Sequence, residues 1–263
     1  MTPSRPPRFF VPPTAGAVPA LRAGADVALP ASEAHHAAHV LRLGPGEGVE
    51  LFDGRGAVAA ARIADVARGG VTATVESVRT AGPEPAPALR LAFAVPKGKR
   101  LEWLLEKATE LGAARLAPVR FARSVAGGEA LSPTARGRWE ARCIAAAKQA
   151  GRAHLPVIEP VRPLAEALPA GEPALVGDAG AAARPVARVL AALPRGPCPQ
   201  TLHLYVGPEG GLTDAERALL ADAGATAVRL GRTVLRVETA AAALLAVSAA
   251  WRDGAAGPGV AEQ

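Results

Sequence analysis

The sequence predicts an α/β protein in which a small β-rich domain is followed by a larger domain built on a parallel sheet. Three observations support this prediction. Residues 1–80 contain short apolar runs separated by turn residues, and residues 81–89 are rich in proline. Over residues 90–263, strand-like runs alternate with helix-like ones, which is typical of parallel α/β sheets. We therefore expect domains at 1–80 and 90–263, joined by a semi-stiff linker at 81–89.

The first domain is predicted from its turn signals. The apolar run 49–52 leads into Asp53-Gly54, a dipeptide typical of tight turns between strands. Residues 71–75 alternate between apolar and polar side chains, as a half-buried strand does. One helix is expected to interrupt these strands at 32–43, with Ser32 as its N-cap.

The second domain is predicted from changes in periodicity. Segment 101–111 places its leucines on one helical face and ends at Gly112. Segment 240–251 is apolar on every side, so we expect this helix to be buried, against its own domain or a second subunit. Strands are expected at 91–95, 116–121, 174–176, 202–206 and 227–230, and helices at 101–111, 134–150, 214–223 and 240–251.

Composition narrows the class of protein. The chain has 263 residues, of which 49% are hydrophobic, so it can bury a core. It has no run of about 18 strongly apolar residues, and its first residues lack the apolar segment of a signal peptide. Its two cysteines, Cys143 and Cys198, are too few for a disulfide framework or a cysteine-based metal site. We expect a cytoplasmic protein.

The positive charge is concentrated in one segment. The chain has a net charge of +6. Residues 97–152 hold twelve lysines and arginines against five glutamates, a local net charge of +7. Ordinary solvated helix surfaces would also explain this excess. Its concentration in one segment favours a polyanionic partner such as RNA or DNA.

Two glycine-rich loops stand between strand-like and helix-like segments. The first is 207–211, Gly-Pro-Glu-Gly-Gly, and it precedes a capping box, Thr213 to Glu216, that marks the start of a helix. This geometry presents free backbone N–H groups to a ligand. Neither the phosphate-binding nor the dinucleotide-binding glycine formula is present. An ordinary tight turn would also explain the loop, but Glu209 favours a cationic or hydroxyl-bearing ligand over phosphate.

The second loop, 230–236, adds charged side chains. A structural interpretation covers Thr239 as the N-cap of the last helix and Glu238 near its positive end. That interpretation does not explain Arg232 and Arg236 in the same loop. The two loops together therefore predict a pocket for a small molecule.

Three histidines lie on the helix expected in the first domain. His35 and His39 are one helical turn apart, as zinc ligands can be, but neither a third ligand nor a glutamate at position 36 accompanies them. We therefore expect no metal site. Plain surface polarity would explain this face, and a face shared with Arg42 that contacts RNA is the functional interpretation.

The two loops and several other motifs resemble the RsmE family of the SPOUT methyltransferase superfamily. The resemblance covers nearly the whole chain, with its motifs in the family's order. This chain departs from the family pattern at Lys148, where the family commonly has glutamate, and at Ala153, where it commonly has asparagine. The matching segments are Arg8-Phe9-Phe10, 36–42, Phe52-Asp53-Gly54, 107–112, Gln149-Ala150-Gly151-Arg152, 207–213 and 230–240.

The resemblance implies both fold and activity. It implies a PUA-like N-terminal β-barrel domain that binds RNA and a trefoil-knotted C-terminal α/β domain with helices on both faces of its parallel sheet. It also implies a homodimer that binds S-adenosyl-L-methionine. The implied reaction is methylation of N3 of a uridine in 16S ribosomal RNA of the small subunit.

On this basis each group of residues receives an expected role. Arg236 is expected to stabilise negative charge on the uracil, with Glu238 or Thr239 orienting it. Glu209 is expected to meet the ribose or the amino-acid end of the cofactor. The cofactor pocket is expected to comprise Gly207, Glu209, Gly210, Gly211, Leu230, Gly231 and Leu235. RNA is expected to contact Arg8, His39, Arg42, Lys97, Arg123 and Arg152.

Two other functions stay open at this point. One is a SPOUT methyltransferase that acts on another RNA, such as tRNA. The other is a non-catalytic RNA-binding protein of ribosome assembly that keeps the fold without the chemistry. The intact glycine loops argue against the second, because a protein that had lost its cofactor would not need them.

Overall fold

A computed structural model describes residues 5–13, 21–125, 130–169, 171–180, 182–194 and 201–255. For Ala255 it describes only the backbone. The chain divides into two compact units. Unit 1 comprises Met1–Pro83 and Ala147–Leu155, and unit 2 comprises Glu84–Ala146 and Pro156–Gln263. The sequence predicts a single break at 81–89 and gives no sign that a second segment joins unit 1.

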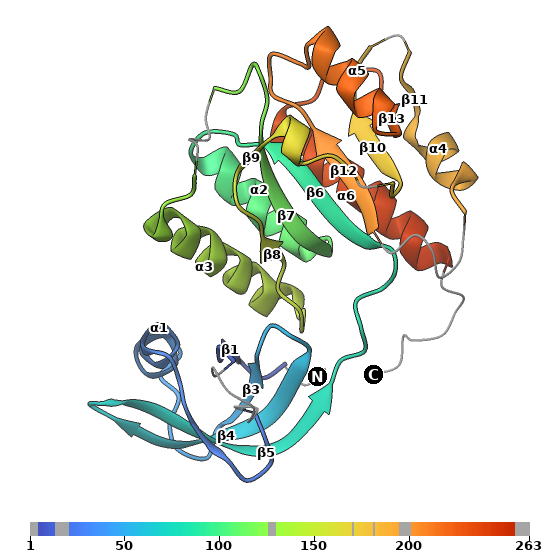
Figure 1. Ribbon diagram of the computed structural model, residues 1–263. Helices are drawn as coiled ribbons and strands as arrows, with labels where there is room; N and C mark the ends of the chain where they lie inside the picture. The colour runs from blue at the N-terminus through green and yellow to red at the C-terminus, as the bar shows by residue number, and fades with distance from the viewer. Residues whose placement is uncertain are drawn as a thin grey trace. The chain divides into compact units, whose positions relative to one another are not determined.

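Unit 1 is a five-stranded sheet with the strand order β1-β3-β4-β5-β2 (Figure 1). β1 and β3 are parallel, and the other neighbours are antiparallel. Its core gathers side chains from these strands and from the short helix α1. The elements are β1 (Arg8–Phe10), β2 (Asp26–Ala28), α1 (Ala31–His35), a π-helix (His36–Val40), β3 (Gly48–Phe52), β4 (Ala57–Ala67) and β5 (Gly70–Thr80).

The predicted turn at Asp53-Gly54 joins β3 to β4. The Asp53 carboxylate accepts hydrogen bonds from the backbone N–H groups of Arg55 and Ala57, at 2.7 and 3.0 Å. Gly54 has φ 74°, a conformation that few other residues adopt. The helix expected at 32–43 is shorter and ends in a π-helical turn at Val40. The prediction that Ser32 caps it is wrong, because the helix begins at Ala31 without a side-chain cap.

Unit 2 confirms the predicted parallel sheet. Its strand order is β11-β13-β10-β12-β6-β7-β8, with β9 also pairing to β7, and every pairing is parallel. The strands are β6 (Ala88–Ala94), β7 (Ala113–Arg120), β8 (Val157–Ile158), β9 (Arg162–Pro163), β10 (Ala174–Gly177), β11 (Arg184–Pro185), β12 (Thr201–Val206) and β13 (Ala225–Arg229). The helices are α2 (Lys99–Glu110), α3 (Pro133–Ala150, whose last turn belongs to unit 1), η2 (Leu164–Glu166), α4 (Val186–Ala192), α5 (Asp214–Asp222) and α6 (Val237–Ala255).

Helices cover both faces of this sheet, as predicted. Leu202, Leu204 and Val206 of β12 point into a core shared with α2, α3, α4 and α6. The intervening Tyr205 points into a second core with Leu164 of η2 and Leu220 of α5. The alternation along β12 therefore separates the two layers of helices. α6 is buried on the face that carries Leu244 and Leu245, and half-buried on much of the rest.

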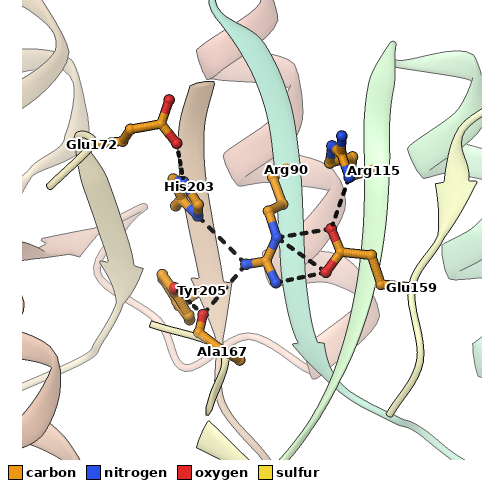
Figure 2. A network of polar contacts seen from close by, with 7 residues as sticks. All are labelled: Arg90, Arg115, Glu159, Ala167, Glu172, His203 and Tyr205. Atoms are coloured by element: carbon orange, nitrogen blue, oxygen red, sulfur yellow. Dashed lines mark hydrogen bonds and ion pairs between the residues drawn. The ribbon is translucent and has the colours of Figure 1, made fainter. Parts of the chain in front are cut away.

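A polar network crosses the second face near the start of the same strands. Arg90 of β6 lies at its centre, between Glu159 and His203 (Figure 2). Its Nη2 donates to Glu159 at 2.7 Å, and its Nη1 lies 3.4 Å from His203 Nδ1. His203 Nε2 in turn lies 2.9 Å from Glu172, and Tyr205 donates to the Ala167 carbonyl at 2.6 Å. Because Glu159, Ala167 and Glu172 all belong to one connecting segment, the network fastens that segment to the sheet.

Parallel strands bring three loops to one edge of the sheet. Gly177, the last residue of β10, is in register with Val206 of β12 and with Val228 of β13. The segments that follow these strands therefore leave the sheet side by side. Ligands of open α/β sheets bind at this carboxyl edge.

Candidate functional site

A cavity of about 370 Å³ lies at the carboxyl edge of the sheet in unit 2. Three loops and the start of α6 form its walls. A volume of this size suits a small organic molecule. The lining residues are 177–180 after β10, 206–209 with Gly211, Leu212 and Arg217 after β12, and 228–235 with Val237 and Ala240 around the third loop.

The first glycine loop is shaped by close contacts. A Cβ atom at Gly207 would lie 2.8 Å from Leu212, and Gly211 has φ 70°. Both positions therefore favour glycine. The predicted capping box is confirmed, since Thr213 accepts from the Glu216 N–H while the Glu216 carboxylate accepts from the Thr213 N–H.

Glu209 and Gly210 make contacts that the sequence did not predict. The Glu209 carboxylate forms an ion pair with Arg100 of α2, and its side chain is 52% exposed. Gly210 does not line the cavity. Its carbonyl accepts a hydrogen bond from Arg123 Nη1 at 2.8 Å, and a Cβ atom there would lie 3.3 Å from Arg123 Cβ. The structure thus brings Arg123, expected on RNA, against the glycine loop.

The loop after β10 is a part of the site that sequence analysis missed. Asp178 lines the cavity, and its carboxylate accepts from Gly180 N at 2.9 Å and from Arg217 Nε at 2.8 Å. Burial alone would raise the pKa of this carboxyl, but the hydrogen bonds from Arg217 and Gly180 outweigh it and lower the pKa. Asp178 is therefore an ionised acceptor in the pocket. Its signal in the sequence was a Gly-Asp-Ala-Gly run directly after a short apolar strand.

The second predicted loop also lines the cavity. Leu230, Gly231 and Leu235 are among its walls. Arg232, Thr233 and Val234 join them, and the Val234 side chain is largely exposed. An exposed apolar side chain at the mouth of a cavity is available to a ligand or a partner.

The three residues expected to be catalytic follow that loop. Arg236 and Thr239 are exposed, and Glu238 is buried with its Oε2 lacking a hydrogen-bond partner in the described part of the chain. None of the three lines the cavity, although Leu235, Val237 and Ala240 do. The interpretation of Thr239 as an N-cap is wrong, because α6 begins at Val237 and the Ala240 N–H bonds the Arg236 carbonyl.

Arg8, expected on RNA, is buried inside unit 1. Its side chain is 3% exposed, it pairs with Glu50, and its Nη1 donates to the Ala147 carbonyl at 3.1 Å. The guanidinium also lies 4.6 Å from the centroid of the Phe52 ring. These contacts place Arg8 where it holds strands β1 and β3 and the last turn of α3 together.

Other expected RNA contacts in unit 1 lie on its surface. His39 and Arg42 are exposed, next to exposed Val40 and Leu41. The rings of His35 and His39 are 4.8 Å apart, and Arg42 has φ 57°, an unusual conformation for arginine. The π-helix and this turn together present the side chains to solvent.

The remaining expected RNA contacts fall in different units. Lys97 is exposed in unit 2, near the start of α2, and Arg152 is half-buried in unit 1. The two departures from the family pattern also belong to unit 1. Lys148 donates to the buried Glu33 at 2.6 Å and lies 5.2 Å from the Phe9 ring, and Ala153 packs beside a small core cluster. Lys148 therefore has partners within the unit.

Several other kinds of site lack support in the described residues. No group of three or more histidine, cysteine, aspartate or glutamate side chains there could hold a metal ion. No helix there has the length and apolarity needed to cross a membrane. Burial raises the pKa of the Cys143 thiol to about 11, so this residue is not a thiolate nucleophile. Cys198 lies outside the described residues.

Comparison with protein families matches both units. An RNA methyltransferase domain matches residues 83–249, and an RNA methyltransferase PUA domain matches residues 29–76. The first match covers the entire cavity. The PUA match confirms the expected class of the N-terminal domain.

Individual relatives agree over most of the chain. The ribosomal RNA small subunit methyltransferase E of Mycobacterium bovis is 39% identical over 231 residues, covering 84% of this chain and 85% of that protein. The crystal structure of the same-named protein from Neisseria gonorrhoeae, bound to S-adenosyl methionine, matches with a TM-score of 0.79 at 29% identity, covering 92% of this chain and 96% of the other. A methyltransferase from Legionella pneumophila, also with bound cofactor, matches with a TM-score of 0.80 at 28% identity, covering 94% and 98%.

Proposed function

The chain belongs to the RNA methyltransferase family that includes the ribosomal RNA small subunit methyltransferases E, and we propose that it methylates N3 of a uridine in 16S ribosomal RNA. The methyl donor in this proposal is S-adenosyl-L-methionine. The observation that carries the proposal is the cavity of about 370 Å³, formed where the loops after β10, β12 and β13 meet.

The residues of this cavity fit the proposed cofactor. Gly207, Gly211 and Gly231 line the cavity without side chains, so a ligand can approach their backbone closely, and Leu230 and Leu235 offer apolar contact to a flat base. Asp178 supplies an ionised acceptor for an ammonium group or for ribose hydroxyls. The chemistry that the cofactor supplies is a methyl group on a positively charged sulfur.

Within this proposal, Glu209 and Gly210 take different roles from the other loop residues. Glu209 lines the cavity, but its carboxylate is shared with Arg100. Gly210 acts through the shape of the loop, because it faces Arg123 and not the cavity. Cofactor contact is therefore proposed for Asp178, Gly207, Glu209, Gly211, Leu230, Gly231 and Leu235.

Arg236 is the residue proposed to act on the uracil. It lies between two residues that line the cavity, and its guanidinium is exposed and makes no ion pair in the described part of the chain. The N3 nitrogen forms its new bond to the methyl carbon, the carbon–sulfur bond breaks with its electron pair on sulfur, and the N3 proton is released to the medium. Arg236 stabilises the negative charge that the uracil acquires when it loses this proton.

Glu238 and Thr239 are proposed to support Arg236 from the first turn of α6. Glu238 is buried in this turn, and Thr239 is exposed there, where it can contact RNA. Neither has to touch the cofactor for this role. The essential catalytic contribution is alignment of N3 with the methyl carbon.

RNA is proposed to contact the exposed cations. Arg42 and His39 on unit 1 and Lys97 on unit 2 have side chains available to phosphates, and Arg152 adds charge to unit 1. Arg8 is not included, because its guanidinium is enclosed by Glu50, Phe52 and Ala147. It instead supports the strands that carry the RNA-binding surface.

The proposal extends to assembly and location. We infer a homodimer with a trefoil-knotted C-terminal domain, as the family resemblance implies, and a cytoplasmic location, as expected from the composition. The meeting of three loops at one cavity and the exposed Val234 beside it support a fold in which chain segments cross closely and a partner covers the pocket.

Mass-spectrometric mapping of the methylated nucleotide tests the proposed function. Small ribosomal subunits that lack the modification would be incubated with the protein and labelled cofactor, with tRNA as a parallel substrate. The proposal predicts one N3-methyluridine in 16S ribosomal RNA. Label in tRNA alone would favour another RNA target, and cofactor that neither binds nor reacts would favour a non-catalytic RNA-binding protein.

A further inference from the structure

We propose that Arg123, assisted by Arg100, is a positioning residue that holds the glycine loop 207–211 in its cofactor-binding shape. This inference rests on the proposed function, because the loop is proposed to bind S-adenosyl-L-methionine. It gives Arg123 a role distinct from the RNA contact expected from the sequence.

The topology of the sheet places Arg123 and Arg100 beside the loop. β12, which precedes the loop, has β10 on one side and β6 on the other, and β7 follows β6. The segments after β10 and β13 line the cavity. The segments after β6 and β7 instead carry Arg100 and Arg123. Loop 207–211 is therefore held between a ligand side and a protein side.

The turn after β7 is closed by two hydrogen bonds between Phe121 and Ser124. Phe121 is buried, and its N–H donates to Ser124 Oγ at 3.0 Å. The Ser124 N–H donates back to the Phe121 carbonyl at 3.1 Å. The two residues between them, Ala122 and Arg123, thus have a fixed backbone.

This turn contacts both the glycine loop and the start of α5. Arg123 Nη1 donates to the Gly210 carbonyl at 2.8 Å, and the Ala122 N–H donates to the Glu216 carboxylate at 2.7 Å. Glu216 also completes the capping box that starts α5. The carbonyl in the loop and the helix start that follows it are therefore tied to the same short turn.

The lack of a side chain at Gly210 lets the loop come close to Arg123. Its Cα approaches the Arg123 side chain so closely that a Cβ atom would lie 3.3 Å from Arg123 Cβ and 3.4 Å from Cδ. The backbone φ of Gly210 is not in the left-handed region, unlike that of Gly211. A side chain at position 210 would therefore press on Arg123, which would have to shift by a few tenths of an ångström.

Arg100 contributes a second, weaker contact. It lies in the first turn of α2 and pairs with Glu209 at the exposed surface. Exposed ion pairs contribute little because water and salt screen them. The hydrogen bond from Arg123 to the Gly210 carbonyl also lies at the surface, but it acts on the backbone of the loop itself, and the same turn adds the bond from Ala122 to Glu216. Arg123 is therefore the principal support.

Such a support matters because glycine-rich loops lose much conformational entropy when a ligand orders them. If the loop is already held in the free protein, the cofactor does not have to order it, and affinity rises. A binding free energy that is less favourable by about 1.4 kcal/mol corresponds to a tenfold weaker affinity. That is the size of effect expected from removing Arg123.

An RNA contact by Arg123 would have different consequences. A phosphate contact contributes to RNA affinity and to its dependence on salt, and does not require the cofactor loop to change. A positioning role changes the loop in the free protein and changes cofactor affinity. The two roles are separable in one set of variants.

The test uses the full-length protein with Arg123→Ala, Arg123→Lys and, as a matched control, Arg188→Ala on the exposed surface of α4. Hydrogen exchange of the Gly211 amide, which donates to the Pro208 carbonyl at 2.8 Å, reports on the loop without cofactor. Calorimetry gives cofactor affinity, and filter binding gives RNA affinity. Unchanged melting temperatures show that the variants fold.

We expect Arg123→Ala to bind S-adenosyl-L-methionine about tenfold more weakly and to exchange the Gly211 amide several-fold faster, because a released carbonyl lets the loop open. RNA affinity should change little in Arg123→Ala and in Arg123→Lys, and Arg188→Ala should match the wild type. Unchanged exchange and cofactor affinity in Arg123→Ala, with weaker RNA binding, would overturn the positioning role. If the wild-type Gly211 amide exchanges slowly and Arg123→Ala speeds it up, but the protein binds no cofactor, the proposed function is contradicted. The positioning role of Arg123 is then still supported.

Discussion

The two ends of the strands in the sheet of unit 2 use polar residues in opposite ways. Near their starts, Arg90 and His203 are buried and every charged group of the network has a partner. Beyond their carboxyl ends, the loops leave Arg232 and Arg236 exposed and give Asp178 to the cavity. Both ends carry arginine and carboxylate groups, so residue type does not distinguish them.

Satisfaction of hydrogen bonds does distinguish them. A charge that is buried and fully paired stabilises one arrangement of the chain and has little capacity left for a ligand. A charged group at the mouth of a cavity can still form hydrogen bonds or an ion pair with a ligand. We therefore propose that the first end fixes the fold and the second carries the cofactor site, and the variants below test that division.

The largest effect is expected from breaking the buried network. Arg90→Met removes the main partner of Glu159, which keeps only Arg115 at 3.7 Å, and it leaves His203 Nδ1 without its Arg90 contact in a poorly solvated site. Loss of one partner of a buried ion pair costs about 3–5 kcal/mol. We expect a free energy of unfolding lower by about 3 kcal/mol in urea denaturation.

Ligand binding by the folded form of the same variant tests whether the two ends of the strands are independent. At low temperature, where the variant is folded, cofactor affinity should stay within about threefold of the wild type, because the network is not part of the cavity. A large loss of cofactor affinity in the folded variant would show that the two ends of the strands are not independent.

The next largest effect is expected from Arg236→Ala. Removing a group that stabilises developing charge lowers the rate of the chemical step by about 100-fold or more. Cofactor affinity should change by less than about threefold, because Arg236 does not line the cavity. Single-turnover methylation and calorimetry measure the two quantities separately.

Arg232→Ala is the matched control for this prediction, since Arg232 is also exposed but lines the cavity. It should affect cofactor affinity more than the rate of the chemical step. Equal methylation rates in Arg236→Ala and the wild type would remove Arg236 from the mechanism.

A smaller effect is expected from Asp178→Asn. The amide keeps an acceptor for Gly180 but loses the negative charge in the cavity, so cofactor affinity should fall about tenfold. Asp214→Asn is a suitable control, because Asp214 pairs with the same Arg217 but is fully exposed. If both variants weakened the cofactor equally, the effect would come from Arg217 and not from a contact of Asp178.

The smallest effect is expected from pH acting on His203. Burial lowers the pKa of this imidazole, and Arg90 adds to the effect while the hydrogen bond to Glu172 opposes it. Protonation would place an N–H on Nδ1 facing the Arg90 guanidinium. The unfolded chain therefore binds a proton at a higher pH than the folded one, so stability is present above about pH 6.5 and decreases as the pH falls below it.

The variant His203→Gln tests this assignment, because glutamine offers a donor and an acceptor but does not titrate. The slope for one proton cannot exceed about 1.4 kcal/mol per pH unit. Urea denaturation between pH 5 and 7 should show a shallower dependence in the variant than in the wild type. Identical slopes would mean that other groups cause the dependence.

How far the sequence could predict the molecule depends on how local the signal is. The parallel sheet, the capping box at Thr213 and the lining role of Gly231 follow from periodicity and turn residues within a few positions. The predicted ends of helices are less accurate where neighbouring residues favour different end positions. Thr239 resembles an N-cap, but the helix begins two residues earlier at Val237.

The parts that could not be predicted depend on contacts distant in sequence. Arg123 and Gly210 are 87 positions apart, and Arg8 and Ala147 are 139 apart. A single sequence shows that these residues are basic or small, but not which of them meet. Asp178 was missed for the same reason, since its loop becomes part of the site only when β10 pairs with β12 and β13.

Hydrogen exchange with and without S-adenosyl-L-methionine tests the central claim most directly. We predict that the cofactor slows exchange in the three loops, 177–180, 207–212 and 230–235, and at the start of α6, while amides around Arg90 and His203 change little. Protection confined to those segments would place the ligand in the cavity at the carboxyl edge. Cofactor that binds while these loops stay unprotected would contradict the assignment of this cavity.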